Sequence, residues 1–322
     1  MRLYNIAIIG LGNIGRRHFI SLLKSHEDFN FYLFDNKNLS ISKTKNLLNS
    51  KNSKNVFFEK NIYKINKIID LLIVSTTSEV RFIVLKTFLK ENIVNNVILE
   101  KIVTNNISDY KKIMKILGKK KINSYINFPR RLYEVYNYIK DNLNKNSPIH
   151  IKFQSENWNM ASNVLHFLDL LNFFSKNNKI YLKESNLQNK IIKSKRKNFI
   201  EFKGNLLFGD ENKNSIFLAD QPLISKDEYI SIEQKNLKYF VFEKKSTLVS
   251  IKNNGKLKLS NKRIRIPYQS DLTKSVVFNI IKNRKVKLPS IYDSYHNHNL
   301  IFKIFKKHLN KIKKNNLEFL IT

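Results

Sequence analysis

Hydrophobic and polar positions in the first 125 residues alternate between two patterns. Short continuous apolar runs predict buried strands, and apolar residues spaced three or four positions apart predict helices. The expected strands are residues 5–10, 29–34, 68–74 and 97–99, and the expected helices are residues 18–25, 39–49, 79–90 and 108–117. Strands that alternate with helices at this pitch indicate an α/β fold with a doubly wound parallel sheet. We therefore expect residues 1–125 to form one domain of this class.

The pattern changes after about residue 125. Short apolar stretches between 180 and about 266 are separated by Asn, Lys and Gly turns, which predicts an antiparallel or mixed sheet. The other elements expected here are a strand at 149–155 and helices at 131–143, 161–174, 271–282 and 292–310. Residues 126–322 are thus predicted to form an α+β domain with a mostly antiparallel open sheet, and the closing helices can pack back on the first domain.

Composition narrows the class of protein. A chain of 322 residues with 42% hydrophobic residues is long enough for two cores. The absence of cysteine excludes disulfides, thiolate metal sites and a cysteine nucleophile. The chain starts without a charged region leading to a cleavage site, and no apolar run reaches the roughly 18 residues of a membrane span. We expect a cytoplasmic protein with no membrane partner.

The formal net charge of +34 raises the question of a nucleic-acid partner. Only ten of the 59 basic residues are arginine, the residue favoured for bidentate phosphate and base recognition, and the lysines are scattered along the chain. The low glycine and proline content and the many Asn, Ile and Lys residues are typical of A/T-rich codon usage. We therefore interpret the charge as solvated lysine faces and expect no specific nucleic-acid partner.

A glycine-rich turn follows the first expected strand. Gly10, Gly12 and Gly15 fit the pattern G-x-G-x-x-G between a strand and a helix, with Asn13 and Ile14 opening that helix. In a dinucleotide-binding site the first glycine permits a tight turn, the second lets the backbone approach a pyrophosphate, and the third allows close helix packing. The alternative is a glycine-rich turn of another α/β fold. The context favours a Rossmann domain whose helix N-terminus binds the phosphates.

Asp35 lies twenty residues after Gly15, at the end of the second expected strand. A carboxylate at this place accepts hydrogen bonds from the adenosine ribose and repels a 2′-phosphate. NAD is therefore the expected cofactor, with NADP kept open because Arg16 and Lys37 are near in sequence. Ser75, Thr76 and Thr77 follow the strand at 68–74, where small hydroxyl residues can pass beneath a dinucleotide or instead cap the next helix.

These features, together with Glu100-Lys101 after a short strand, resemble the Gfo/Idh/MocA family of oxidoreductases (glucose-fructose oxidoreductase, inositol dehydrogenase and rhizopine catabolism). That family carries Glu-Lys-Pro here, and this chain has Ile102 in place of the proline. A second segment, 162–169, is similar to the family's Asp-x-x-x-His-x-x-Asp segment. His166 falls on the catalytic histidine, whereas Ser162 falls where many members have a catalytic aspartate.

The resemblance implies roles for several residues. Lys101 would reach the nicotinamide and substrate, with Glu100 beside the cofactor, and His166 would remove a hydroxyl proton near neutral pH while hydride leaves the same carbon. The alternatives are a surface lysine and a core histidine. Asp169 can orient the imidazole or be solvated. No metal is expected, because His296 and His298 have no third ligand at suitable spacing.

Candidate substrate ligands are cationic, polar or aromatic. Arginine pairs can bind a carboxylate or phosphate bidentately, and a tryptophan can stack on a sugar ring, although surface charge and interdomain packing are the competing interpretations. The candidates are Arg130, Arg131, Trp158, Ser162, Asn163 and Arg196, with Lys195 beside the last.

Short segments in the second half also resemble a branch of the family from surface-polysaccharide and sialic-acid-like sugar biosynthesis. They include 127–131, 157–158, 194–196, 268–270, 288–289 and His298. The leading hypothesis is an NAD(P)-dependent dehydrogenase or reductase acting on a CH–OH group of a sugar, assembled as a homo-oligomer. The alternatives are a catalytically impaired nucleotide-binding regulator and a nucleic-acid-associated protein.

Overall fold

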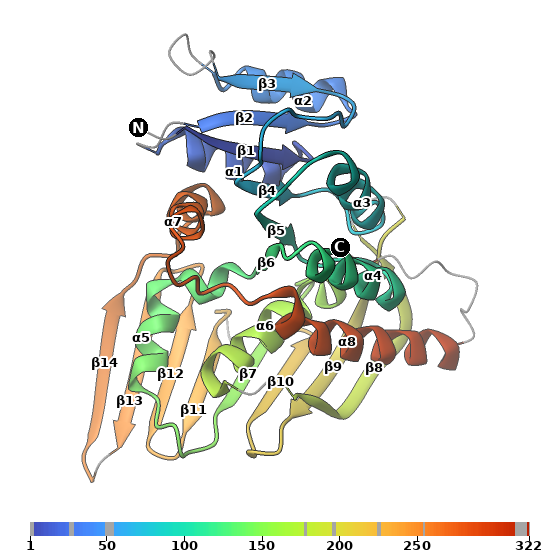
Figure 1. Cartoon of the computed structure of the whole chain (residues 1–322). Helices are drawn as coiled ribbons and strands as arrows, with labels where there is room; N and C mark the ends of the chain where they lie inside the picture. The colour runs from blue at the N-terminus through green and yellow to red at the C-terminus, as the bar shows by residue number, and fades with distance from the viewer. Residues whose placement is uncertain are drawn as a thin grey trace. The chain divides into compact units, whose positions relative to one another are not determined.

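The protein is described by a computed structural model that covers residues 3–25, 29–48, 55–176, 179–194, 198–223, 227–253, 255–312 and 321. The chain divides into two compact units (Figure 1). Unit 1 comprises Met1–Pro129 and Pro267–Tyr292, and unit 2 comprises Arg130–Ile266 and Asp293–Thr322. The expected boundary after residue 125 lies close to the first crossing between the units. The segment from 267 to 292, expected in the second domain, belongs to unit 1.

Unit 1 contains a six-stranded parallel sheet with the order β3-β2-β1-β4-β5-β6. Its strands are β1 (Tyr4–Ile9), β2 (Phe29–Phe34), β3 (Val56–Glu59), β4 (Leu71–Val74), β5 (Asn96–Glu100) and β6 (Asn123–Asn127). Every residue of β2 and β4 is buried, as expected for parallel strands covered on both faces. This order is that of a Rossmann fold and confirms the predicted doubly wound sheet.

The helices of unit 1 are α1 (Asn13–Leu23), α2 (Asn38–Lys45), α3 (Arg81–Glu91), α4 (Ile107–Lys119) and α7 (Gln269–Ile281). Helix α1 begins five residues before the expected start, directly after the glycine turn. Helix α7 packs on α1. The Lys274 amide donates to Ser21 Oγ at 2.9 Å, and the Thr273 hydroxyl lies 2.8 Å from His18 Nδ1. A segment from the last fifth of the chain therefore covers the first helix.

Unit 2 contains an eight-stranded sheet with the order β14-β13-β12-β11-β7-β10-β9-β8. Only the β7–β10 pair is parallel, so the sheet is mixed and mostly antiparallel, as predicted. Its strands are β7 (His150–Ser155), β8 (Tyr181–Lys193), β9 (Ile200–Gly209), β10 (Ser215–Asp220), β11 (Ile230–Gln234), β12 (Leu237–Phe242), β13 (Thr247–Asn253) and β14 (Leu257–Arg263).

Helices α5 (Glu134–Asn142), α6 (Met160–Ser175) and α8 (Ile291–Lys311) lie over one face of this sheet (Figure 1). The helix expected at 131–143 is preceded by a separate 3₁₀ turn, Pro129–Leu132. Helix α6 is buried over most of its surface, which is typical of a central core helix. Phe202 of β9 stacks on Phe305 of α8 with ring centroids 4.8 Å apart. Across the described ranges, no helix combines the length and apolar character that a bilayer span requires.

Candidate functional site

The three glycines of the turn after β1 serve three different geometric needs. Gly10 has φ +92°, and a Cβ there would lie 2.7 Å from the Thr76 amide nitrogen. A Cβ on Gly15 would lie 1.8 Å from the Gly10 carbonyl oxygen, so the helix and the turn are in direct backbone contact. A Cβ on Gly12 would meet nothing within 4 Å. The middle glycine thus keeps open a space that a side chain would fill, which fits a bound pyrophosphate.

The N-terminus of α1 opens onto this space. Gly12 is the N-cap residue and supplies no side-chain cap, so the first N–H groups of the helix remain available for an anion. Asn13 is exposed and Ile14 is half-buried. The Arg16 guanidinium donates to the Leu11 carbonyl at 2.8 Å and to Asn13 Oδ1 at 2.7 Å. Arg16 therefore adds a positive charge beside the turn, as its nearness in sequence indicated.

Asp35 follows β2 and is tied to the same turn. Its Oδ2 accepts a 2.6 Å hydrogen bond from the Leu11 amide, and its Oδ1 accepts one of 2.8 Å from the Lys37 amide. An ionised carboxylate has about four acceptor positions, so capacity remains for ribose hydroxyl groups. Two backbone donors therefore fix this negative charge beside the glycine turn.

The turn after β4 contacts the glycine turn through Ser75. The Ser75 hydroxyl donates to the Gly10 carbonyl at 2.7 Å, whereas the Thr76 hydroxyl is buried and has no partner among the described residues. Thr77 is half-buried. The alternative helix-capping role is wrong, because α3 has Val80 as N-cap and no side-chain cap. The Thr76 hydroxyl is therefore a polar group that a cofactor in this turn could satisfy.

Glu100, predicted to contact the cofactor, is part of a buried polar network in unit 1. His18 Nε2 lies 2.9 Å from Glu100 Oε1, and the Asn127 amide donates to the same oxygen at 2.5 Å. Burial opposes ionisation, but the hydrogen bonds from His18 and Asn127 and the charge of Arg81 lower the pKa of Glu100 overall. Gln269 completes the network by accepting from Asn127 at 3.0 Å. Sequence reasoning gave no role to His18, and it named Asn127 only as part of the segment 127–131.

Arg81 connects the strand ends that carry the predicted cofactor residues. Its guanidinium is 1% exposed and donates to the backbone carbonyls of Glu100 (2.6 Å), Val103 (3.3 Å), Ile102 and Thr76. The segment between Glu100 and Ile102 carries Lys101, which is half-buried. The peptide bond between Lys101 and Ile102 is cis. The position of Lys101, directly after β5, therefore depends on an arginine at the first position of α3.

The second predicted group lies on α6 in unit 2. Ser162 is buried, while Asn163 and His166 are half-buried. The Asn163 side chain donates to the Trp158 carbonyl at 2.8 Å, which closes the loop before the helix. Ser162 and His166 are four residues apart and so lie on the same face of α6. The Ser162 hydroxyl and amide both donate to Glu201, the amide at 3.3 Å.

Arg130 and Arg131, predicted to bind an anionic substrate, are each paired with a carboxylate of unit 2. Arg130 donates to both oxygens of Glu243 at 2.9 and 2.8 Å, and Arg131 Nε donates to Asp169 Oδ2 at 2.8 Å. Arg130 therefore grips its carboxylate bidentately, whereas Arg131 contacts Asp169 through Nε. Both arginines have a structural role in unit 2, and their contact with a substrate anion stays a prediction. Asp169 is buried and paired with Arg131, so it is not a solvated carboxylate.

Asp169 provides a pH-dependent contribution to stability. Burial raises the pKa of Asp169 from its ordinary 3.8 to about 6, against the opposing charge of Arg131. The stabilising contribution of the protonated Asp169 carboxyl is fully present below about pH 4, and it is lost as the pH rises through 6. We expect the stability difference between wild type and Asp169→Asn to fall by about 3 kcal/mol over this window. Urea unfolding of both proteins from pH 4 to 7 measures it, and a difference that rises with pH would contradict this assignment.

Two other substrate candidates have different outcomes. Trp158 is 9% exposed, donates through Nε1 to the Ala219 carbonyl at 3.0 Å, and packs edge-on against Phe153 and Phe167. Trp158 is therefore part of the core of unit 2, which favours a packing role over stacking on a sugar. Arg196 and Lys195 lie outside the described residues.

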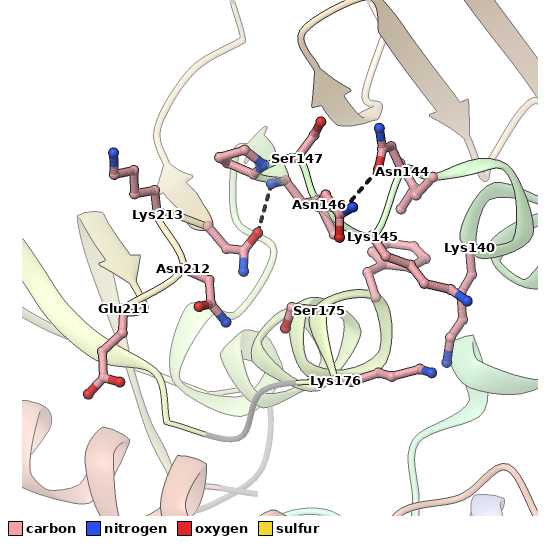
Figure 2. Close-up of a pocket in the computed structure, with 15 residues that line it drawn as sticks. Lys140, Asn144, Lys145, Asn146, Ser147, Ser175, Lys176, Glu211, Asn212 and Lys213 are labelled. Atoms are coloured by element: carbon pink, nitrogen blue, oxygen red, sulfur yellow. Dashed lines mark hydrogen bonds between the residues drawn. The ribbon is translucent and has the colours of Figure 1, made fainter.

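A cavity of about 640 Å³ in unit 2 lies apart from all these residues. It is lined by the ends of α5 and α6 and by the turn between β9 and β10. Figure 2 shows Lys140, Lys145 and Lys176 on one side and Lys213 with Glu211 on the other. No predicted site residue lines it. Among the residues that the structure describes, no three His, Asp or Glu side chains form a metal-binding group.

Comparison with known proteins agrees with the geometry of unit 1. Residues 4–128 match the family described as "Oxidoreductase family, NAD-binding Rossmann fold", GFO_IDH_MocA. No curated protein matches the chain in sequence.

Solved structures share the fold over nearly the whole chain. UDP-N-acetylglucosamine 3-dehydrogenase GnnA from Acidithiobacillus ferrooxidans has a TM-score of 0.72 at 11% identity, covering 94% of this chain and 97% of that one. A Gfo/Idh/MocA family oxidoreductase from Vibrio cholerae has a TM-score of 0.72 at 14% sequence identity, and the match covers 97% of this chain and 100% of that one. A super-repressor mutant of Gal80p from Saccharomyces cerevisiae has a TM-score of 0.72 at 15% sequence identity, and the match covers 98% of this chain and 99% of that one. Residues 4–128 thus match the NAD-binding Rossmann-fold model of this oxidoreductase family in sequence, and the rest of the chain shares its fold with these solved structures.

Proposed function

We propose that the protein is an NAD(P)-dependent oxidoreductase that acts on a hydroxyl-bearing carbon of a sugar or sugar derivative, in surface-polysaccharide biosynthesis. The observation that carries the proposal is the open position above Gly12, at the uncapped end of α1 and beside Asp35. The structural likeness to a UDP-N-acetylglucosamine 3-dehydrogenase supports a nucleotide sugar as the first substrate to test. We further propose that the protein acts as a homo-oligomer.

Separate residues of the chain would bind the cofactor and act on the substrate. Backbone amides from Gly12 to Ile14 would hold the pyrophosphate, Asp35 the adenosine ribose, and the Thr76 hydroxyl a further polar atom of the cofactor. When bound, the nicotinamide supplies the hydride acceptor or donor. Lys101 polarises the substrate oxygen, and His166 holds the proton taken from the hydroxyl. Ser162 and Asn163 are the remaining candidates for contacts with the sugar.

Nucleotide titration tests the first half of this proposal. Titration with NADH and NADPH, followed by fluorescence, should give saturable binding with NADH preferred. Asp35→Asn retains one acceptor oxygen but removes the charge, so the preference for NADH should shrink by about tenfold, equivalent to about 1.4 kcal/mol. The absence of binding by either nucleotide would reject the proposal.

Turnover tests the second half. With NAD and a panel that begins with UDP-N-acetylglucosamine, Lys101→Ala and His166→Ala should each lower kcat by about 10²-fold or more, because each removes a group that polarises the substrate or takes its proton. Lys86→Ala on α3 and His150→Ala on β7 change the same residue types at exposed positions and should leave kcat unchanged. A near-normal rate in either test variant would remove that residue from the mechanism.

A nucleotide-binding regulator without turnover is the second candidate function. Two observations favour it, namely Ser162 at the position where the family resemblance expects an aspartate and the structural likeness to Gal80p, which the Kluyveromyces lactis structure describes as a transcriptional regulator. Tight NADH binding without reduction or oxidation of the cofactor in the presence of the sugar panel would favour this function.

A further inference from the structure

Glu201 is a buried carboxylate that the family resemblance does not assign. It lies on β9, is 3% exposed, and accepts hydrogen bonds from the hydroxyl and the amide of Ser162 at the first turn of α6. Ser162 stands where related sequences are expected to carry an aspartate. A carboxylate is therefore present at the start of α6 after all, but it comes from a strand and not from the helix.

The sheet is irregular close to this side chain. The β8–β9 register shifts between Leu187 and Ile191, and Gly204 has φ +117° with its missing Cβ 2.2 Å from the Asn186 carbonyl oxygen. A regular strand turns successive side chains to opposite faces, yet Glu201 and Phe202 are both buried. Bulges of this kind redirect side chains and are common beside functional sites.

Other charged groups lie around α6, among them Lys140 and Asp293, which act on Asp169. On the helix, Asp169 is paired with Arg131. On β9 and β10, the strands that pack against α6, Lys203 lies 3.8 Å from Glu156, and Asp220 accepts a hydrogen bond from the Asn157 amide. Glu201 is thus the carboxylate bonded directly to the helical turn that precedes His166.

We propose that Glu201 is a positioning residue that supplies, through Ser162, the negative charge which stabilises the protonated imidazole of His166. Ser162 and His166 lie one helical turn apart on the same face, and a nearby negative charge favours a protonated imidazole. When His166 accepts a proton from a substrate hydroxyl, the O–H bond breaks, the N–H bond forms, and the new positive charge lies near Glu201. The catalytic consequence rests on the proposed function, but the electrostatic claim does not.

The test is a histidine titration by NMR on the full-length protein without cofactor or substrate, with the His166 signal assigned through His166→Gln. Glu201→Gln keeps the shape of the side chain and removes its charge, so the His166 midpoint should fall by about one pH unit. Ser162→Asp combined with Glu201→Gln moves the carboxylate to the helix and should restore the midpoint. Glu184→Gln on β8 removes an exposed charge and serves as the matched control.

Three results would overturn the proposal. The first is a shift of the His166 midpoint in Glu201→Gln that is no larger than the shift in Glu184→Gln. The second is a double variant that does not restore the midpoint. If Glu201→Gln does not fold, the carboxyl ¹³C signal of Glu201 in the wild type decides, because a protonated Glu201 at pH 7 cannot supply the charge. Since the titration needs no nucleotide, failure of NADH binding would reject the proposed function and leave this result standing.

Discussion

Gly15→Ala is expected to abolish NADH binding and to destabilise unit 1 at the same time. The new Cβ would lie 1.8 Å from the Gly10 carbonyl oxygen and 2.7 Å from the Ser75 hydroxyl. Because the first neighbour is backbone, the helix must move away from the turn, which distorts the phosphate-binding amides. Overpacking of this kind costs about 1–3 kcal/mol or more. Thermal unfolding and fluorescence titration with NADH measure the two effects.

Gly12→Ala is the matched variant, because it separates binding from folding. Gly12 has φ −65°, and a Cβ there meets no protein atom within 4 Å. The variant should therefore unfold like the wild type, yet lose most of its NADH affinity because the methyl group occupies the space of the pyrophosphate. Wild-type NADH affinity in Gly12→Ala would show that the pyrophosphate does not lie over this turn.

Arg81→Met is expected to produce the second large effect. The change removes a buried guanidinium and leaves the carbonyls of Thr76, Glu100 and Ile102 without this donor. Unsatisfied buried groups cost about 1–3 kcal/mol each, and Glu100 also loses a favourable charge. We expect a total loss of about 3–5 kcal/mol. Chemical denaturation of the wild type and the variant gives this number directly.

Arg81→Lys distinguishes charge from geometry in the same position. Lysine keeps the positive charge but cannot reach carbonyls on two separate turns with a planar fork. Its stability should lie between those of the wild type and Arg81→Met, while turnover should fall because the segment carrying Lys101 is less firmly held. An Arg81→Lys variant equal to the wild type in both measurements would show that the fork geometry is unimportant.

The nucleotide-binding half of the fold was predictable because its signals are local. The strand before Gly10, the helix after Gly15 and the carboxylate at Asp35 are set by spacing within a few dozen residues. Strands β3 and β6 were missed because β3 is only four residues long and β6 reads Asn-Ser-Tyr-Ile-Asn, a largely polar sequence. Their parallel neighbours, β2 for β3 and β5 for β6, supply the backbone pairing that these two sequences do not predict.

The candidate site was less predictable where a role depends on a distant partner. The carboxylates that pair with Arg130 and Arg131 lie 113 and 38 residues away, and the partner of Ser162 lies 39 residues away. No spacing rule connects such positions. Trp158 was assigned by residue type, and only its hydrogen bond to Ala219 and its two aromatic neighbours show that it belongs to the core.

The interrupted path of unit 1 has a consequence for synthesis of the protein. Helix α1 packs against α7, so the outer face of the first helix stays exposed until residues 269–281 have been synthesised. All strands of the sheet in unit 2 precede residue 269, so the ribosome synthesises them before α7. The Rossmann unit is therefore the first begun and among the last completed, and a fragment that stops near residue 129 would present His18 and Ser21 to water.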